Sequence, residues 1–449
     1  MNRTSRPRPR RYRPLAERFE DRLLLAAGSP THDAIAAVLF SPSGASPVRP
    51  NTPVLPFGAS ASSASFVDPS VRINFGKHVE IGRQSFIAPY ATLNAGPSGY
   101  IKIGSASTVQ DDAVLLGNPD RLPGAIGVVI GDNVYIGAGT TVRGPAQVGG
   151  FGVEAASAAA MVGANALIDG GTVSPGAIVS TQARVGPGVT IPSGFRVLPG
   201  ANVSTQAEAG NPALGKVVPV TAADLATLNS YLSNNVALAA GYTALYQGNP
   251  ATGTSPGVPL TTTGINNGNL ATVRGASVEP GNPTVRFEPA RQGPRFLGGS
   301  GQSVQGLFSS FRARVTGQVV FGDRPSSISH HLGRGNSFRG DEGQPITIGS
   351  IAQTGRDVSI HSPGSGTITI GRNLDAGSGS RILGSPAGAT TVGNDVGIGP
   401  GAVVFSSAIG SGSTIGSRAY VSNSTLPPGS VVPAGTILIN NQNLGTIQW

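Results

Sequence analysis

Residues 128–148 read VVIGDNVYIGAGTTVRGPAQV, and this stretch decides the fold. An aliphatic residue returns in it at every sixth position, at Ile130, Ile136, Val142 and Val148. An α-helix would turn successive members of this series by about 120° around its axis. The period therefore predicts neither a helix nor an ordinary strand, but a chain that coils back over itself.

The same period continues through most of the chain, which has 449 residues. In the first half, the further members of the series are Phe75, Ile81, Ile87, Leu93, Ile103, Val109, Leu115, Val173, Val179, Val185, Ile191, Val197 and Val203. In the second half, they are Ile348, Thr354, Ile360, Ile370, Ala376, Ile382, Val392, Ile398, Val404, Ile409, Ile415 and Val421. The closing phrase STLPPGSVVPAGTILI of the second half also parallels VTIPSGFRVLPGANVS of the first. We therefore expect two repeat domains derived from one duplicated unit.

A coil of three short strands satisfies this period, because each strand directs one aliphatic side chain into a triangular interior. Val and Ile suit such strands, and Gly suits the corners between them. One coil cannot bury its interior alone, so coils must stack into an array. The sequence therefore predicts an all-β protein with two parallel β-helices of hexapeptide repeats, and one α-helix after the first.

Composition divides the chain into four parts. Residues 1–57 form a basic leader with a sorting-like motif and a linker. Residues 58–249 form the first β-helix with its C-terminal helix, which we expect to begin at Thr221. Residues 250–275 are rich in Gly, Pro and Thr and predict a flexible linker. Residues 276–449 form the second, more divergent β-helix.

The charge distribution excludes one class of partner. The net charge is +9, but residues 1–22 hold eight arginines and three acids, so +5 of it lies in the leader. Because the repeats are nearly neutral and show no aromatic-basic interleaving, we expect no nucleic-acid binding. The absence of cysteine excludes disulfides and thiolate metal sites, which leaves histidine and carboxylates as zinc ligands.

The leader carries a candidate address. Its segment FEDRLLL at 19–25 resembles the Leu-Glu-x-Arg-x-Leu-Leu sorting element of exported and surface proteins of certain bacteria, although Phe19 departs from the usual Leu. The apolar run is too short to span a bilayer, and we expect no transmembrane segment elsewhere. Export or display at the cell surface is the expectation. A frayed amphipathic helix in a cytoplasmic protein is the alternative.

Several segments resemble the gamma-class carbonic anhydrases of the hexapeptide-repeat (isoleucine-patch) superfamily. In the first half these are SFVDPS at 65–70, ASTVQDDAVLLG at 106–117, STQAEA at 204–209 and NVALAAGYTALYQG at 235–248. In the second half, SFRGDEGQPITIG at 337–349 is similar to the family's Arg-x-Asp-Glu-Gly-x-Pro segment. The resemblance implies left-handed coils, as in LpxA-like proteins, and a homotrimer whose symmetry the duplication can alter.

The resemblance also implies where the family's three zinc histidines would fall. In the first half these positions hold Leu116, Ala138 and Arg143, and Gln110 with Asp111 matches the family's Gln-Asp pair. In the second half they hold His361, Ser378 and Leu383, and Gly355 with Arg356 replaces the pair. His361 is the sole matching ligand, although Glu342 could join it. Because a catalytic zinc needs three protein ligands, we expect no zinc and no other cofactor unless unrecognised ligands exist.

The candidate catalytic remnants are Gln110, Asp111, Arg339, Asp341 and Glu342. The family's Arg and Asp at the subunit boundary correspond to Arg339 and Asp111, while Asn94 and Arg356 occupy the other two positions. Each half thus keeps one member of the pair. We hypothesise self-association through the β-helix faces, either as a trimer or by pairing of the two halves within one chain, with Arg339 facing Asp111. Exchanging the two charges should then restore what either single mutation loses.

The missing ligands favour a non-catalytic scaffold or binding protein, in effect a pseudoenzyme. A divergent carbonic anhydrase or a hexapeptide acyltransferase is the alternative, because the fold alone does not decide the chemistry. Acyl transfer needs a histidine base, and the histidines besides His361 are His32, His78, His330 and His331. We expect His78 to pack or face solvent and the adjacent pair to be solvated. An anion site formed by Arg143, Gln110 and Arg339 is a third hypothesis.

Overall fold

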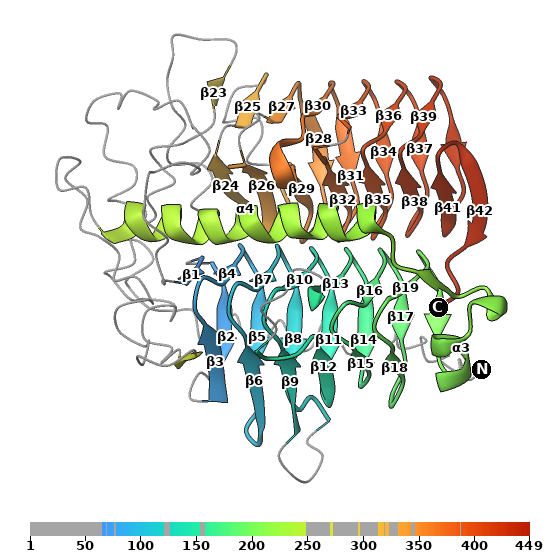
Figure 1. The fold of residues 1–449 in the computed structure, drawn as a ribbon. Coiled ribbons are helices and arrows are strands. Elements are labelled where there is room, and N and C mark those ends of the chain that lie inside the picture. Colours follow the sequence, from blue (N-terminus) through green and yellow to red (C-terminus); the bar gives the residue numbers. More distant parts are fainter. Residues whose placement is uncertain are drawn as a thin grey trace, which may run out of the picture. The chain divides into compact units, whose positions relative to one another are not determined.

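The computed structural model describes three stretches of the chain. They are residues 65–247 without 69, 76–77, 121–125 and 153–157; the strands at 270–272 and 295–296; and residues 313–449 without 318, 323–330, 343–345 and 387. Within them, consecutive coils stack so that each strand pairs with the equivalent strand of the next coil (Figure 1). The predicted fold class is confirmed, with two left-handed parallel β-helices and one long α-helix after the first.

Three sheets, here named A, B and C, form the faces of the first β-helix. Sheet A contains β1 (Phe66–Val67), β4 (Phe86–Ile87), β7 (Thr108–Val109), β10 (Val134–Ile136), β13 (Ala160–Val162), β16 (Ile178–Val179), β19 (Phe195–Val197) and the antiparallel β21 (Val217–Pro219). Sheet B contains β2 (Arg72–Asn74), β5 (Thr92–Asn94), β8 (Val114–Leu116), β11 (Thr141–Arg143), β14 (Leu167–Asp169), β17 (Arg184–Val185) and β20 (Asn202–Val203). Sheet C contains β3 (Val79–Gly82), β6 (Gly99–Ile103), β9 (Ile126–Ile130), β12 (Ala146–Val148), β15 (Thr172–Val173), β18 (Thr190–Ile191) and the antiparallel β22 (Leu270–Thr272).

The second β-helix repeats the arrangement in sheets D, E and F. Sheet D contains β23 (Arg295–Phe296), β25 (Val319–Phe321), β27 (Ile346–Ile348), β30 (Ile368–Ile370), β33 (Thr390–Val392), β36 (Ala408–Ile409) and β39 (Thr425–Leu426). Sheet E contains β24 (Ala313–Gly317), β26 (Asn336–Gly340), β29 (Ser359–His361), β32 (Arg381–Leu383), β35 (Val403–Phe405), β38 (Tyr420–Ser422), β41 (Thr436–Ile439) and the antiparallel β42 (Gln442–Thr446). Sheet F contains β28 (Ile351–Thr354), β31 (Leu374–Ala376), β34 (Gly397–Ile398), β37 (Thr414–Ile415) and β40 (Val431–Val432).

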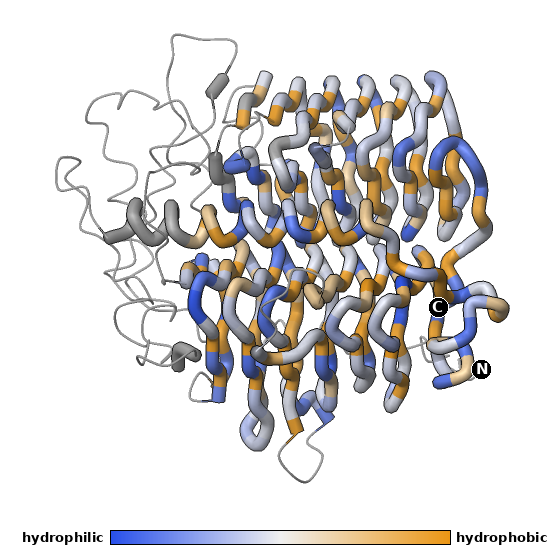
Figure 2. Tube along the Cα trace, viewed as in Figure 1, coloured by the Kyte–Doolittle hydropathy of each residue, from blue (hydrophilic) through white to orange (hydrophobic). Residues whose placement is uncertain are grey.

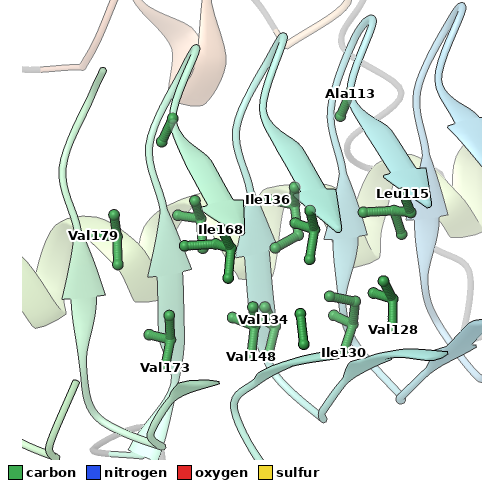
Figure 3. Packing of buried hydrophobic residues seen from close by; sticks show 14 of the residues in the cluster. Ala113, Leu115, Val128, Ile130, Val134, Ile136, Val148, Ile168, Val173 and Val179 are labelled. Atoms are coloured by element: carbon green, nitrogen blue, oxygen red, sulfur yellow. The ribbon is translucent and has the colours of Figure 1, made fainter. Parts of the chain in front are cut away.

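The six-residue series fills the two interiors. Ile136, for example, is fully buried and pairs with Val109 in the preceding coil and Val162 in the next. Figure 3 shows side chains from different sheets, among them Leu115 and Val173, pointing into the space that the strands enclose. Apolar segments accordingly recur along the strands of both β-helices in Figure 2. Burial of these apolar side chains drives the stacking of the coils, because the free energy gained is proportional to the apolar area removed from water.

One member of the predicted series is wrong. Phe75 is 50% exposed and lies at a corner with a φ of 58° instead of pointing inward. The inward position of that strand belongs to Ile73, which pairs with Leu93 and packs against the core. The error arose because Ile73 and Leu93 are 20 residues apart, so this coil departs from the six-residue count.

The helix predicted to begin at Thr221 is α4, which spans Ala222–Gln247. Thr221 caps it, since its hydroxyl accepts a hydrogen bond from the Asp224 backbone N–H, and the Asp224 carboxylate accepts one from the Thr221 N–H. A shorter helix, α3 (Gln206–Gly210), carries a similar capping box between Thr205 and Glu208. No helix in the described residues is long and apolar enough to cross a membrane.

The division of the chain into a leader, two β-helices and a linker remains a prediction. The leader at 1–57 and most of the linker lie outside the described residues. Within the range assigned to the linker, Leu270–Thr272 forms β22, which pairs with β3 of the first β-helix.

Replacing Ile136 by Ala tests the stacking. The removed atoms leave a cavity between two coils, so we expect the free energy of unfolding to fall by about 2–5 kcal/mol in urea titrations followed by circular dichroism. The matched control is Gln147→Ala on the exposed face of sheet C, which should change it by less than about 0.5 kcal/mol. Equal effects of the two substitutions would contradict the inward assignment.

Candidate functional site

A charged cluster lies buried between the two β-helices, and its centre is the guanidinium of Arg339. The Arg339 side chain has 0% exposure, and its Nη1 donates to Asp111 Oδ2 at 2.8 Å and to Gln110 Oε1 at 2.9 Å. Its Nε donates to Asp341 Oδ2 at 3.2 Å. A buried cation needs such partners, because desolvation of an unpaired charge is very costly. The pair predicted from the sequence therefore forms, and it is buried.

Local structure fixes both sides of this contact. Arg339 lies on β26 and points outward from sheet E, since Phe338 before it fills the interior. Gln110 and Asp111 follow β7 at the corner between sheets A and B. We call this edge, with Asp68, Gln110, Asp111, Asp112, Asn165 and Gln182, the corner surface. Ser337, two residues before Arg339, donates from its hydroxyl to Asp111 Oδ1 at 2.6 Å.

His361 joins the cluster from the next coil, where it pairs with Arg339 along sheet E. Its Nε2 lies 3.0 Å from Glu342 Oε1, and its Nδ1 lies 3.7 Å from Asp111 Oδ2. The other carboxylate oxygen of Glu342 accepts from the Gly364 backbone N–H, at the short helical turn Pro363–Ser365. His361 is thus held by a carboxylate and buried to 1% exposure.

Helix α4 covers one side of the cluster. Asn235 on α4 accepts from Gln110 Nε2 at 2.9 Å and from Thr108 Oγ1 at 3.2 Å. One turn earlier, Tyr231 packs against Tyr135, with ring centroids 5.4 Å apart. Burial raises the pKa of both phenols, and the nearby Glu342 carboxylate raises the pKa of Tyr231 further. The helix therefore excludes water from this region.

Two more ion pairs with the same polarity join the β-helices. Arg314 on β24 donates to Asp68, from Nη2 to Oδ2 at 2.8 Å and from Nε to both oxygens. Arg381 on β32 donates from Nη1 to Asp112 Oδ2 at 2.8 Å. In every one of the three pairs, the acid belongs to the first β-helix and the arginine to sheet E of the second. Gly139 makes room for one of them, because a Cβ there would lie 2.4 Å from Arg381 Nη2.

Asp112 has an unusual environment for a carboxylate. It is 8% exposed, and its Oδ1 is buried without a hydrogen-bond partner among the described residues. Burial raises its pKa from 3.8 to about 8, while the Arg381 guanidinium acts in the opposite direction.

The structure brings together six of the residues named from the sequence, namely Gln110, Asp111, Arg339, Asp341, Glu342 and His361. The remaining zinc positions do not join them as ligands. Leu116 and Arg143 lie on sheet B, Ala138 is buried, Ser378 is an exposed corner residue, and Leu383 packs in an apolar cluster with Ala164, Val403, Tyr420 and Ile437.

The anion site proposed from Arg143, Gln110 and Arg339 has no support. Arg143 pairs with Asp120 at 3.2 Å and is 37% exposed, whereas Arg339 already bonds Gln110 inside the interface. His78 is exposed, with Nδ1 2.8 Å from the Gly99 carbonyl oxygen, and His331 is also exposed. His32 and His330 lie outside the described residues.

The sequence did not predict the ion pairs of Arg314 and Arg381. It also did not predict the hydrogen bonds to the side-chain amide of Asn235. The available signal was an arginine in two otherwise apolar or neutral strands, ARVTG at 313–317 and RIL at 381–383. An arginine in a strand does not indicate which acid it pairs with, because the partner can be far away in the sequence. Asp68, for example, is 246 residues from Arg314.

The expected charge exchange between Arg339 and Asp111 needs correction. Arg339 also bonds Asp341 and lies 3.8 Å from Glu342. An aspartate at position 339 would face two further acids, so the exchanged pair cannot restore stability.

Asp341, Glu342 and His361 offer ligand atoms within 4.8 Å of one another, which is compact enough to consider a metal ion. Their chemistry fits such an ion poorly. Glu342 already accepts from His361 and from Gly364, and Asp341 accepts from a guanidinium, which would repel a cation bound to the same carboxylate. The residues present therefore do not reproduce a zinc site with three free ligands and an open position.

Comparisons with known proteins found no matching family model and no matching curated protein. A hexapeptide transferase family protein from Anaplasma phagocytophilum is 19% identical, with a TM-score of 0.29, over 39% of this chain and 92% of that one. Proteins assigned as acetyltransferases from Bacillus cereus and Desulfovibrio desulfuricans are 20% and 10% identical, with TM-scores of 0.20 and 0.22. They cover 40% and 85% of this chain and 99% and 68% of their own. Similarity this low carries no argument about activity.

Arg339→Met tests the central ion pair. The substitution leaves Asp111, Asp341 and Glu342 buried without their cation, so we expect the free energy of unfolding to fall by about 3–5 kcal/mol. Arg143→Met is the matched control, because that arginine forms an exposed pair and should cost less than about 1 kcal/mol. Urea titrations of both variants measure the difference, and similar losses would contradict the role of Arg339.

Asp112→Asn tests the buried carboxyl. Because the pKa of Asp112 is raised in the folded state, that state binds more protons than the unfolded state between pH 4 and pH 8. The free energy of unfolding should therefore fall as the pH rises through this window, by roughly 1 kcal/mol for every pH unit. The Asn variant should show a flatter profile in urea titrations. Asp120→Asn, which changes an exposed acid, is the control, and its pH profile of the free energy of unfolding should be parallel to that of the unchanged protein. A parallel profile for Asp112→Asn as well would contradict the assignment.

Proposed function

We propose that this chain is a non-catalytic, gamma-carbonic-anhydrase-like scaffold in which the former metal cleft holds two β-helices together. The observation that carries the proposal is the complete burial of Arg339 among acids of both halves, with 0% exposure for Arg339, Asp111 and Glu342. A hydrating enzyme needs metal ligands that face carbon dioxide and water, whereas His361 and Glu342 are buried here. Instead of binding a metal, the two side chains bond one another at 3.0 Å.

The residues that stand at the positions of the expected zinc histidines support the same proposal. At two of the positions that the resemblance assigns to zinc histidines, Ala138 and Leu383 now contribute buried apolar surface. The corner beside Ala138 also admits Arg381, which binds Asp112. Small and apolar residues, together with arginine, suit an interface and do not suit a metal centre.

A divergent carbonic anhydrase is the second candidate, because one observation favours it. Asp341, Glu342 and His361 bring three candidate ligand atoms for a divalent cation, from two carboxylates and one imidazole, within 4.8 Å of one another. A zinc ion held there would supply a bound water of lowered pKa. Two observations argue against this candidate. The Arg339 guanidinium lies 3.2 Å from the Asp341 carboxylate, and all three side chains are buried.

Metal content and carbon dioxide hydration of the purified, tag-free full chain separate the two candidates. We expect no stoichiometric zinc or iron and no hydration above the uncatalysed rate, with His361→Ala unchanged in both readouts. One zinc per chain that disappears in His361→Ala, together with activity, would overturn the scaffold proposal. Zinc that persists in His361→Ala would indicate a site outside this cluster.

A further inference from the structure

The exposed aromatic side chains of this protein gather along sheet C of the first β-helix. In the described part of the chain they are Phe75, Tyr100 and Phe151, which are 50%, 37% and 43% exposed. Tyr100 points outward from β6, Phe75 lies at the corner that leads into β3, and Phe151 follows β12. Single exposed apolar residues are ordinary, but aromatic rings that gather along one sheet indicate a surface that contacts a ligand.

The ring of Tyr100 lies flat against the sheet. Its neighbour in the next coil is Gly127, and a Cβ at Gly127 would lie 2.7 Å from both Cδ1 and Cδ2 of Tyr100. The equal distances place Gly127 beneath the face of the ring and not beside its edge. Glycine therefore supports the ring, and the opposite face of the ring is directed away from the sheet.

The ring of Phe151 is positioned by a contact of its loop. The Asp132 carboxylate accepts a hydrogen bond from the Gly152 backbone N–H at 2.8 Å, which holds the loop that carries Phe151. The Nζ atom of Lys102 lies 4.8 Å from the centroid of the Phe151 ring, within the range of a cation–π interaction. Lys102 follows Tyr100 on the same side of β6, about 6.6 Å along the strand. The two rings therefore flank one ammonium group.

Hydrogen-bonding groups of balanced charge surround the rings. In the register of sheet C, Lys102 pairs with Glu80 of the preceding coil and with Val129 of the next, and Gln147 follows Val129. Because Glu80 offsets the charge of Lys102, this surface lacks the excess of cations that a phosphate backbone requires. The rings are also separated by polar groups, unlike the continuous apolar centre of a protein interface.

Aromatic faces beside amide, carboxylate and ammonium groups fit the two sides of a sugar ring. The C–H groups of a pyranose pack against an aromatic face, and its hydroxyl groups exchange hydrogen bonds with polar side chains. Because a sheet face is flat, it suits an extended polymer better than a compact ligand, which needs a pocket. In the triangular coil, sheet C lies opposite the corner between sheets A and B, so the contact with sheet E leaves it uncovered.

We propose that this face of sheet C binds a neutral, extended polysaccharide. The binding surface consists of the rings of Phe75, Tyr100 and Phe151 and the polar side chains of Glu80, Lys102 and Gln147. Tyr100 and Phe151 stack on sugar rings of one glycan chain, and Lys102 between them donates to its hydroxyl groups. The surface is separate from the buried Arg339 cluster, so the metal and hydration measurements do not bear on it.

Affinity electrophoresis of the full chain tests the proposal in native gels that contain hydroxyethylcellulose or, in parallel, galactomannan. We expect at least one of these neutral polysaccharides to retard the unchanged protein. Tyr100→Ala and Phe151→Ala should each weaken binding about five- to tenfold through loss of one stacking contact, whereas Tyr100→Phe keeps the ring and should bind normally. Leu444→Ala is the matched control, because Leu444 is an exposed apolar residue on β42 of the second β-helix.

Three outcomes would overturn the proposal. They are no retardation by either polysaccharide, retardation that both alanine variants retain in full, and loss of binding in Leu444→Ala to the same extent. A single-stranded oligonucleotide whose binding Tyr100→Ala weakens, without binding of a neutral glycan, would assign the rings to nucleobases instead. Thermal unfolding followed by circular dichroism shows which variants are folded, and only those variants enter the comparison.

Discussion

A buried guanidinium sets the arrangement of this protein. Arg339 has no access to solvent, so its charge must be balanced by groups that lie within hydrogen-bond distance. Its own strand and loop supply Asp341, but Asp111 and Gln110 come from the other β-helix. The two halves must therefore be in contact, and in this register, for the second half to keep Arg339 buried. Helix α4 is tied to the same cluster, because Asn235 on α4 accepts a hydrogen bond from Gln110.

The interface changes character along the two β-helices. Near the first coils it consists of charged pairs such as Arg314 with Asp68. Near the last coils it consists of an apolar cluster in which Ala164 packs with Tyr420 and Ile437. The C-terminal residue Trp449 also donates from its indole to the Gln182 carbonyl oxygen at 2.7 Å. Apolar contact supplies association without direction, whereas the ion pairs fix the register, since a shift of one coil would leave each charge without its partner.

Gly139 lies where the two β-helices approach each other closely. A Cβ at this position would lie 2.1 Å from Asn165 Oδ1 and 2.4 Å from Arg381 Nη2. The absence of a side chain at Gly139 therefore lets Arg381 reach across the contact to Asp112.

The sequence by itself determined the two β-helices and α4, because a six-residue aliphatic period and a Thr-Asp cap are local patterns with few physical solutions. It missed the orientation of Phe75, where a coil of irregular length breaks the count. From the family resemblance it also identified Asp111 and Arg339 as partners. Only the tertiary structure decided that they are buried, that Asp341 and Glu342 share the same cation, and that Arg314 and Arg381 pair with Asp68 and Asp112. These contacts join residues more than 200 positions apart, and a local pattern carries no information about which distant charges meet.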